Sequence, residues 1–436
     1  YLEVAQVDFV SPHRPRDARS PAQTEAKSRE LLEGMKELGR VVPVHFQEPF
    51  RRGYASWNPR AEDFVHDLQA AKAGGGAGWC FHNGDVRDGP DSQPRRSFDL
   101  REKRLFDQFD EQERKAVDLL KAAIGHGAGG SRTTVTIKGG KWYFNDEITY
   151  RGSRAEGLLM NVRMVNSVFE DSQRPEFDAE ANTDEFIAQI PGYAANGVKA
   201  FTLNLQGGFP GYEGAVNSAF SPDGSLRDSY LKRVRRVVET CDRNGVAVIL
   251  GCFYQRQDQV LKDAGAVRAG VSNAVTWITT SGFSNLALEI ANEFDHSGFD
   301  HRVLKTAEGQ VELIQLAKRL APGLLVSTSG LGHGSIPESV ARASDFLLIH
   351  FNSTPLAEIP IRIAALKKFG KPIVCNEDDK PSAQSAEAAC LSVTNGASWG
   401  LMLQTLNQHY PFTFRGATDD PVVYRTLKEL TAVPKR

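Results

Sequence analysis

The sequence predicts an α/β fold: a (β/α)8 TIM barrel preceded by a partial, barrel-like segment of about three βα units. Three observations predict it. Short apolar, β-branched runs alternate with amphipathic helical stretches, which is the pattern of βα units. The runs are apolar on both alternations, as in parallel strands buried on both faces. Finally, a glycine precedes most runs, where a helix ends in a left-handed residue.

Eight runs supply the expected strands of the barrel, and each is followed by polar loop residues. They cover 158–169, 198–205, 246–254, 285–293, 324–330, 345–351, 372–377 and 398–407. Eight βα units favour a closed parallel barrel over an open doubly wound sheet. The open sheet would typically carry a glycine-rich nucleotide-binding turn after its first strand, and no such turn occurs here.

The segments between the runs have the spacing of helices. Apolar residues recur at steps of three and four at Leu231, Val234, Val238 and Cys241, and at steps of three at Val311, Ile314, Ala317 and Leu320. The glycines expected to end helices are Gly197, Gly245, Gly282, Gly323, Gly370 and Gly396. Each helix is therefore expected to bury one stripe of side chains against the strands.

Ahead of the barrel, residues 135–152 alternate around two turn signals like a short β-hairpin, which we expect at the barrel floor. We divide the chain into a segment over 1–128 and a complete barrel with its hairpin over 129–436. The composition of residues 125–134 is typical of a linker.

The segment 1–128 is predicted to be a partial copy of a barrel. Its three runs, over 4–13, 40–48 and 76–83, echo the last three runs of the complete barrel in the same order. Three units cannot close a barrel and would leave strand edges open to pairing. Our hypothesis is that the chain is the C-terminal part of a longer two-barrel protein.

Composition excludes several functions. The 436 residues are 41% hydrophobic and 24% charged, with a formal net charge of −2, so no polyanion such as a nucleic acid is expected as a partner. No window reaches the ~20 apolar residues of a membrane span. The five cysteines define neither a disulfide framework nor a zinc site, and the ten histidines form no His-x-His pair. We expect no metal and no cofactor.

The chemistry-bearing residues are expected where strands end, because catalytic groups of such barrels lie at the carboxyl ends of the strands. The fourth run ends in Asn292-Glu293 and the seventh in Asn376-Glu377. Hydrolysis of a glycosidic bond needs two such carboxyl groups, one to protonate the leaving oxygen and one to attack the anomeric carbon. Glu293 and Glu377 are therefore the predicted catalytic pair.

Over residues 135–436 the sequence resembles glycoside hydrolase clan A, the barrel superfamily that includes many cellulases and mannanases. The resemblance is carried by Asn292-Glu293 after the fourth run and by Glu377 ending the seventh. It implies that Glu293 is the acid/base, that Glu377 is the nucleophile of a retaining mechanism on a β-linked glycan, and that Asn292 bonds the sugar 2-hydroxyl. His350, near the end of the sixth run, would hold the nucleophile.

Further substrate-binding residues are expected around this pair. The resemblance suggests Arg163 in the first run as a rim arginine, and Trp399 in the eighth as a ring that stacks on a sugar. Gln206 and Tyr254 belong to a set of aromatic and amide residues that follows the second and third runs and could form a sugar platform. The other members of the set are Phe209, Tyr212, Phe253 and Gln255.

Other interpretations of these residues stay open. A glutamate at a strand end can merely pair with a lysine or arginine, and the platform set can equally be loop packing. The strongest alternative function is a non-catalytic barrel that binds a glycan or a protein surface. A Schiff-base aldolase would need a buried lysine on a strand, and the runs are nearly free of lysine.

In the partial copy, Glu48 occupies the nucleophile-like position and His13 the position of the sixth-strand histidine. The position of the acid/base would precede Tyr1, so we expect this segment to be catalytically silent. The expected partner of the whole chain is an oligo- or polysaccharide. Because hydrolases of polysaccharides are usually exported, a secreted or periplasmic location is favoured.

Overall fold

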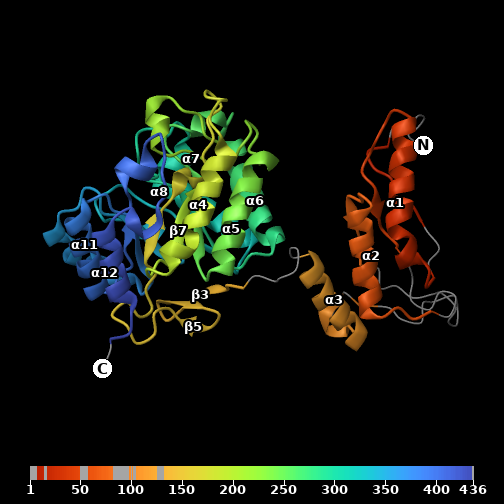
Figure 1. The fold of residues 1–436 in the computed structure, drawn as a ribbon, viewed down its shortest axis with the longest axis horizontal. Coiled ribbons are helices and arrows are strands. Elements are labelled where there is room, and N and C mark those ends of the chain that lie inside the picture. The colour runs from red at the N-terminus through yellow and green to blue at the C-terminus, as the bar shows by residue number, and fades with distance from the viewer. Residues whose placement is uncertain are drawn as a thin grey trace. The chain divides into compact units, whose positions relative to one another are not determined.

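The structure is a computed structural model in which the chain divides into two compact units, Tyr1–Gly130 and Ser131–Arg436 (Figure 1). It describes residues 7–13, 17–49, 57–81, 98–99, 101, 105–124 and 132–434. Most of the expected linker over 125–134, and the first residues of the run over 4–13, lie outside the described residues. Within the described part of the chain, no helix has both the length and the apolar content needed to cross a membrane.

In its described residues, the N-terminal unit contains short parallel strands and three α-helices. Its elements are α1 (Ser20–Glu37), β1 (His45–Phe46), α2 (Ala61–Ala73), β2 (Gly78–Trp79), the 3₁₀ turn η3 (Leu105–Gln108) and α3 (Glu111–Ile124). Strand β1 pairs with β2 in parallel, and a parallel bridge joins Val10 to Val44. A small apolar core forms beneath α1, where Met35 packs with Val44 and Phe46.

The C-terminal unit is a mixed α/β structure in which eight parallel strands fall one within each predicted run. The strands are β6 (Asn161–Arg163), β7 (Ala200–Asn204), β8 (Ala247–Phe253), β9 (Leu286–Ala291), β10 (Leu325–Ser327), β11 (Leu347–His350), β12 (Ile373–Glu377) and β13 (Gly400–Leu401). All eight are shorter than the predicted runs. The run over 398–407 was expected to be one strand, but it is extended only at β13 and then forms a π-helical turn, η9 (Gln404–Gln408).

Each of these strands has a parallel neighbour on both sides. Six form a sheet in the order β10-β9-β8-β7-β6-β13, and β11 pairs with β12. One parallel bridge, between Ser329 and Leu348, connects the residues after β10 to β11. Two more, from Val374 to Ser398 and from Asp378 to Leu401, connect β12 and the residue after it to β13 and the residues before it. The carboxyl ends of all eight strands therefore lie at one end of the unit.

Helices separate the strands along the chain. They are α4 (Ala179–Ala194), α5 (Asp228–Arg243), α6 (Ala264–Ser281), α7 (Arg302–Lys305), α8 (Ala307–Leu320), α9 (Glu338–Ala343), α10 (Ile359–Leu366), α11 (Ser382–Thr394) and α12 (Pro421–Thr431). Gly282 ends α6 with φ of 78°, the left-handed conformation that the sequence predicts there. Gly323 is the exception among the six predicted glycines, because it does not have a positive φ.

A small antiparallel sheet covers the amino ends of the parallel strands. It is formed by β3 (Val135–Lys138), β4 (Lys141–Phe144) and β5 (Glu147–Ile148), so the expected hairpin gains a third strand. Trp142 is fully buried, and its ring packs edge-on against that of Phe346 with the ring centroids 5.2 Å apart. Both rings belong to an apolar cluster that includes residues from the starts of the parallel strands. In Figure 1 this sheet lies at the lower end of the unit. The predicted site residues lie at the opposite ends of the strands, which are the carboxyl ends.

Candidate active site

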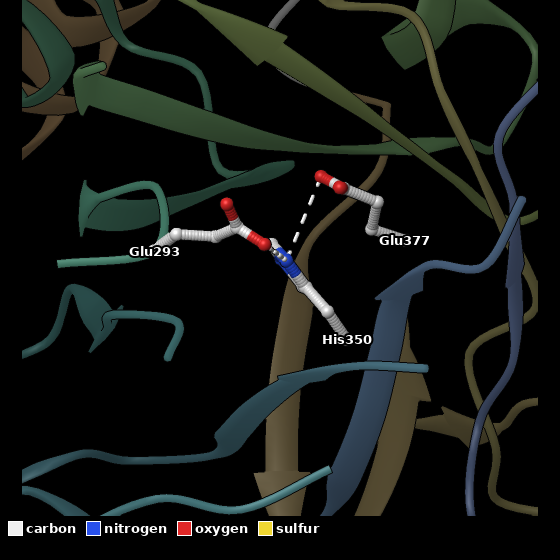
Figure 2. Close-up of side chains that lie close together, drawn as sticks. All are labelled: Glu293, His350 and Glu377. Atoms are coloured by element: carbon white, nitrogen blue, oxygen red, sulfur yellow. Dashed lines mark hydrogen bonds and ion pairs between the residues drawn. The ribbon is translucent and has the colours of Figure 1, made fainter. Parts of the chain in front are cut away.

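Three side chains from the carboxyl ends of different strands converge on one point. Glu293 follows β9, His350 ends β11 and Glu377 ends β12. His350 Nδ1 lies 3.2 Å from Glu293 Oε1 and 3.6 Å from Glu377 Oε2, and Figure 2 shows the three groups pointing toward one another. One ligand atom from each lies within 4.8 Å of the other two. The structure therefore brings together the two glutamates that the sequence places on separate strands.

A β-bulge aims Glu377 into this cluster. In the pairing of β11 with β12, Ile349 lies opposite Cys375, but His350 lies opposite Glu377, so Asn376 is the extra residue. A bulge of this kind redirects the side chains that follow it and is common beside active sites. It makes the histidine and the glutamate direct neighbours across the two strands.

The carboxylate of Glu377 is held in its ionised form. Its side chain is only 8% exposed, and the Nε of Arg163 lies 2.8 Å from Oε2. The amide of Asn352 donates a hydrogen bond of 2.5 Å to Oε1. Burial opposes ionisation, but Arg163, His350 and Asn352 outweigh it and lower the pKa of Glu377 below its usual value. Glu377 is a charged, tightly oriented hydrogen-bond acceptor at neutral pH.

Glu293 is set in a different environment. Its side chain is 13% exposed, and it contacts no arginine or lysine in the described residues. The side-chain amide of Gln255 lies 3.3 Å from Glu293 Oε2. The backbone N–H of Glu293 donates a hydrogen bond to Ser329 Oγ at 3.0 Å. The φ of Glu293 is 47°, a left-handed conformation that is uncommon for residues with a Cβ.

His350 connects the two carboxylates. It is fully buried, and burial alone would lower its pKa, but Glu377 and Glu293 reverse this effect and raise the pKa above its usual value. Nδ1 of His350 faces both glutamates. The histidine therefore lies between the two carboxyl groups and contacts both.

Arg163 and Asn292 link the site across three strands. Arg163 is fully buried at the end of β6, and its Nη2 donates a 2.7 Å hydrogen bond to Asn292 Oδ1 while its Nε faces Glu377. Asn292 in turn donates to Gln255 Oε1 at 3.1 Å. Both residues thus lie beside the glutamates, and their role in substrate binding stays a prediction. Tyr254 is buried next to them, with its ring centroid 6.0 Å from the Arg163 guanidinium carbon.

Two predicted substrate-binding residues lie elsewhere. Gln206 is fully buried, and its amide donates to Ser218 Oγ at 3.0 Å and to the carbonyl of Gln257 at 3.1 Å, so it joins two loops. Trp399 is also fully buried, and its indole N–H donates to Asp378 Oδ2 at 2.8 Å. The stacking role expected for Trp399 is wrong, because a ring near the start of its run is enclosed by the core.

The buried contact of Trp399 predicts a stability effect. Trp399→Phe removes the donor from Asp378 while keeping an aromatic ring, and a buried acceptor that loses a partner destabilises a protein by about 1–3 kcal/mol. We expect the free energy of unfolding, measured in urea by far-ultraviolet circular dichroism, to fall by that amount with little change in KM for any substrate. A large rise in KM with unchanged stability would instead favour a sugar-stacking ring.

Several residues beside the site were not predicted. Asn352 lies two residues after His350, and its polar side chain at a strand end was the available signal. Glu289 and Ser329 lie buried behind Glu293 and carry no sequence signal of their own. Tyr212 and Gln255, named only within the platform set, do reach the site: the Gln255 amide donates to the Tyr212 hydroxyl at 3.1 Å.

The cluster of Glu293, His350 and Glu377 also has the donor types of a metal site. Zinc ligands lie about 2 Å from the ion, so donors as far as 4.8 Å apart would have to move together to share one. The guanidinium of Arg163, 2.8 Å from Glu377, would repel a cation at that point. The spacing and the charge suit proton transfer better than metal binding.

The N-terminal unit contains a similar pair. His13 Nδ1 lies 3.7 Å from Glu48 Oε2, as His350 lies 3.6 Å from Glu377. Both pairs join residues from the ends of successive parallel segments. His13 is much more exposed than His350, with 56% of its side chain accessible.

Comparison with known proteins finds similarity only at the level of structure. No protein-family model and no curated protein sequence matches the chain. Solved structures that resemble it include a candidate glycoside hydrolase from Bacteroides vulgatus ATCC 8482, which is 11% identical with a TM-score of 0.50 over 69% of this chain. The chain spans 61% of the length of that protein.

Two further structures are enzymes by their descriptions. An endo-1,4-beta-mannanase from Rhizomucor miehei is 11% identical, with a TM-score of 0.49 over 68% of this chain and 98% of its own. A glycoside hydrolase family 5 enzyme from Prevotella bryantii B14 is 12% identical, with a TM-score of 0.46 over 66% of this chain and 99% of its own. At such identities the likeness concerns the fold.

Proposed function

We propose that the chain is a glycoside hydrolase that cleaves a β-linked glycan with retention of configuration. The observation that carries the proposal is the convergence of Glu293 and Glu377, whose nearest oxygens are within 4.8 Å. Retaining enzymes hold their two carboxyl groups about 5 Å apart, whereas inverting enzymes separate them by roughly 6.5–9.5 Å to admit a water molecule. The short separation favours a nucleophile and an acid/base acting on opposite sides of one anomeric carbon.

The proposed architecture is a closed (β/α)8 barrel over residues 129–436, preceded by a partial copy over 1–128. The bridges on both sides of the β11–β12 pair support closure, since they give every strand two neighbours. The His13–Glu48 pair supports the copy, because it repeats the histidine and the glutamate of the last units. We expect the copy to be catalytically silent.

In the proposed mechanism Glu377 is the nucleophile. Its lowered pKa leaves it ionised, so an oxygen attacks the anomeric carbon while the bond from that carbon to the leaving oxygen breaks. Glu293 gives its proton to the leaving oxygen. In the second step Glu293 takes a proton from water, the water oxygen bonds the anomeric carbon, and Glu377 is released as a carboxylate.

The surrounding polar residues orient the sugar. Asn292 uses Oδ1 to accept from Arg163 and one amide hydrogen to donate to Gln255, which leaves its second amide hydrogen for a sugar hydroxyl. Tyr254 and Arg163 line the side next to Glu377. The proposed partner is an oligo- or polysaccharide, and a secreted or periplasmic location would suit it.

A substrate panel tests the function. The parent protein, Glu377→Gln and the matched variant Glu48→Gln are assayed on aryl β-glycosides and on β-linked polysaccharides. We expect hydrolysis by the parent and by Glu48→Gln but not by Glu377→Gln. Activity that survives in Glu377→Gln, or a parent that binds glycans without hydrolysing any of the panel, would favour a non-catalytic binding barrel.

The ion pair of Arg163 predicts a change in pH dependence. Because Arg163 helps to lower the pKa of Glu377, Arg163→Met should raise that pKa and move the acidic limb of the kcat/KM profile to higher pH. Arg256→Met removes an exposed arginine at the rim and serves as the control, with its acidic limb unchanged. An acidic limb of Arg163→Met that coincides with that of the parent would contradict the role of Arg163.

A further inference from the structure

A buried carboxyl group lies directly behind Glu293. Glu289 is the fourth residue of β9 and is fully buried. Alternate residues of a strand share a face, so Glu289 lies on the side of Ala287, which packs in the cluster at the centre of the strands. An acidic side chain at the centre of a parallel sheet is costly to bury and needs a reason.

Gly251 leaves space for this group. It lies opposite Glu289 in the β8–β9 pairing. A Cβ at position 251 would lie 3.5 Å from Glu289 Oε2 and 2.3 Å from the Oδ1 of Asn204. The glycine therefore leaves room for two polar side chains between the strands.

Ser329 connects Glu289 to the backbone of Glu293. The Ser329 hydroxyl donates to Glu289 Oε1 at 2.6 Å and accepts from the Glu293 N–H at 3.0 Å. A serine hydroxyl has a single hydrogen, and its use for Glu289 leaves the oxygen lone pairs for the amide. The donors and acceptors thus run in one direction, from the Glu293 amide through Ser329 to Glu289.

Ser329 also holds the next residue. Its carbonyl accepts from the Phe294 N–H at 3.0 Å, so two successive amides are bound by one residue. Between these two anchors the backbone of Glu293 has a φ of 47°. Such a conformation is unfavourable for a residue with a Cβ and persists only when its surroundings impose it.

We propose that Glu289 and Ser329 are positioning residues, which hold Glu293 in its left-handed conformation and so aim its carboxyl group at the leaving oxygen. The inference rests on the proposed function for the role of Glu293, and on the hydrogen bonds alone for its conformation. Burial outweighs the effects of Arg163, His350 and Ser329 and raises the pKa of Glu289 above its usual value.

The test uses the dependence on the leaving group. Ser329→Ala is assayed on two β-glycosides of one sugar, one with a dinitrophenyl group that leaves without protonation and one with an alkyl group that needs it. Loss of orientation at the acid should lower kcat/KM for the alkyl glycoside by roughly 10–100-fold. For the dinitrophenyl glycoside it should lower kcat/KM by less than about 3-fold.

Matched variants separate positioning from general damage. Ser327→Ala removes a serine that lies opposite Glu289 and donates to the Phe346 carbonyl, so it should not produce the leaving-group dependence. Ser329→Thr keeps the hydroxyl and should recover most of the alkyl-glycoside activity. Glu289→Leu should show the same leaving-group dependence as Ser329→Ala. Glu289→Gln keeps an acceptor for the Ser329 hydroxyl and should recover most of the alkyl-glycoside activity. Equal losses on both substrates would overturn the proposal.

A crystal structure of Ser329→Ala decides the question without an assay. We expect the φ of Glu293 to leave the left-handed region and its carboxyl group to move away from His350. An unchanged conformation would overturn the positioning role. If the parent hydrolyses no glycoside, the proposed function fails, yet this measurement still tests the hydrogen-bond chain. Glu289→Leu serves for the same structure if Ser329→Ala does not fold.

Discussion

Glu377→Gln should lower kcat/KM by roughly 10⁴-fold on every substrate of the parent, whatever its leaving group. A neutral amide cannot attack the anomeric carbon, so no covalent intermediate forms. The measurement is the initial rate on dinitrophenyl and alkyl β-glycosides, together with the parent and Glu48→Gln. Glu48 is the matched control because it also lies beside a histidine, at 3.7 Å.

This variant needs a check of folding. Removing one partner of a buried ion pair costs about 3–5 kcal/mol, since Arg163 would keep its charge without Glu377. Assays should therefore be run well below the unfolding temperature, with circular dichroism recorded for each protein. A folded Glu377→Gln that retains more than a few per cent of parent activity would contradict the nucleophile assignment.

Glu293→Gln should lower kcat/KM by roughly 10²–10⁴-fold on alkyl β-glycosides, and much less on dinitrophenyl β-glycosides. The reason is that only a poor leaving group needs a proton when its bond to the sugar breaks. With the dinitrophenyl substrate the second step becomes slow, because no base activates water. Added azide should then restore turnover and yield the β-glycosyl azide.

The control for Glu293 is Asp295→Asn, which neutralises an exposed carboxylate in the same loop. It should leave the leaving-group dependence of kcat/KM unchanged. Equal losses for Glu293→Gln on both substrates, without rescue by azide, would assign Glu293 a structural role. Together with the first variant, this result separates the two carboxyl groups into attacking and proton-transferring roles.

The sequence predicted the parts of the site that depend on strand ends. Glu293, His350 and Glu377 each follow or end an apolar run, and parallel strands bring their carboxyl ends to one edge, so their proximity could be expected. The bulge at Asn376 could not be predicted from the sequence. It depends on the pairing of β11 with β12, and it decides that Glu377 rather than Asn376 faces His350.

The errors come from side-chain surroundings that sequence spacing does not contain. Trp399 lies in an apolar run, and whether its ring faces a sugar or the core depends on how far the strand extends, which is only from Gly400 to Leu401. Gln206 follows a strand as predicted, but the chain turns back and buries its amide against Ser218. Ser329 and Glu289 are 40 residues apart, and only the packing of β9 beside β10 brings them together.

Trapping the glycosyl-enzyme intermediate tests the two-glutamate mechanism most directly. The parent protein is incubated with 2-deoxy-2-fluoro-β-glycosides of the sugars that it hydrolyses, digested, and analysed by mass spectrometry. The mechanism predicts one fluoroglycosyl group on the peptide that contains Glu377, and none on this peptide from Glu377→Gln. Hydrolysis without any adduct and with inversion of the anomeric centre, or an adduct on another carboxyl group, would contradict it.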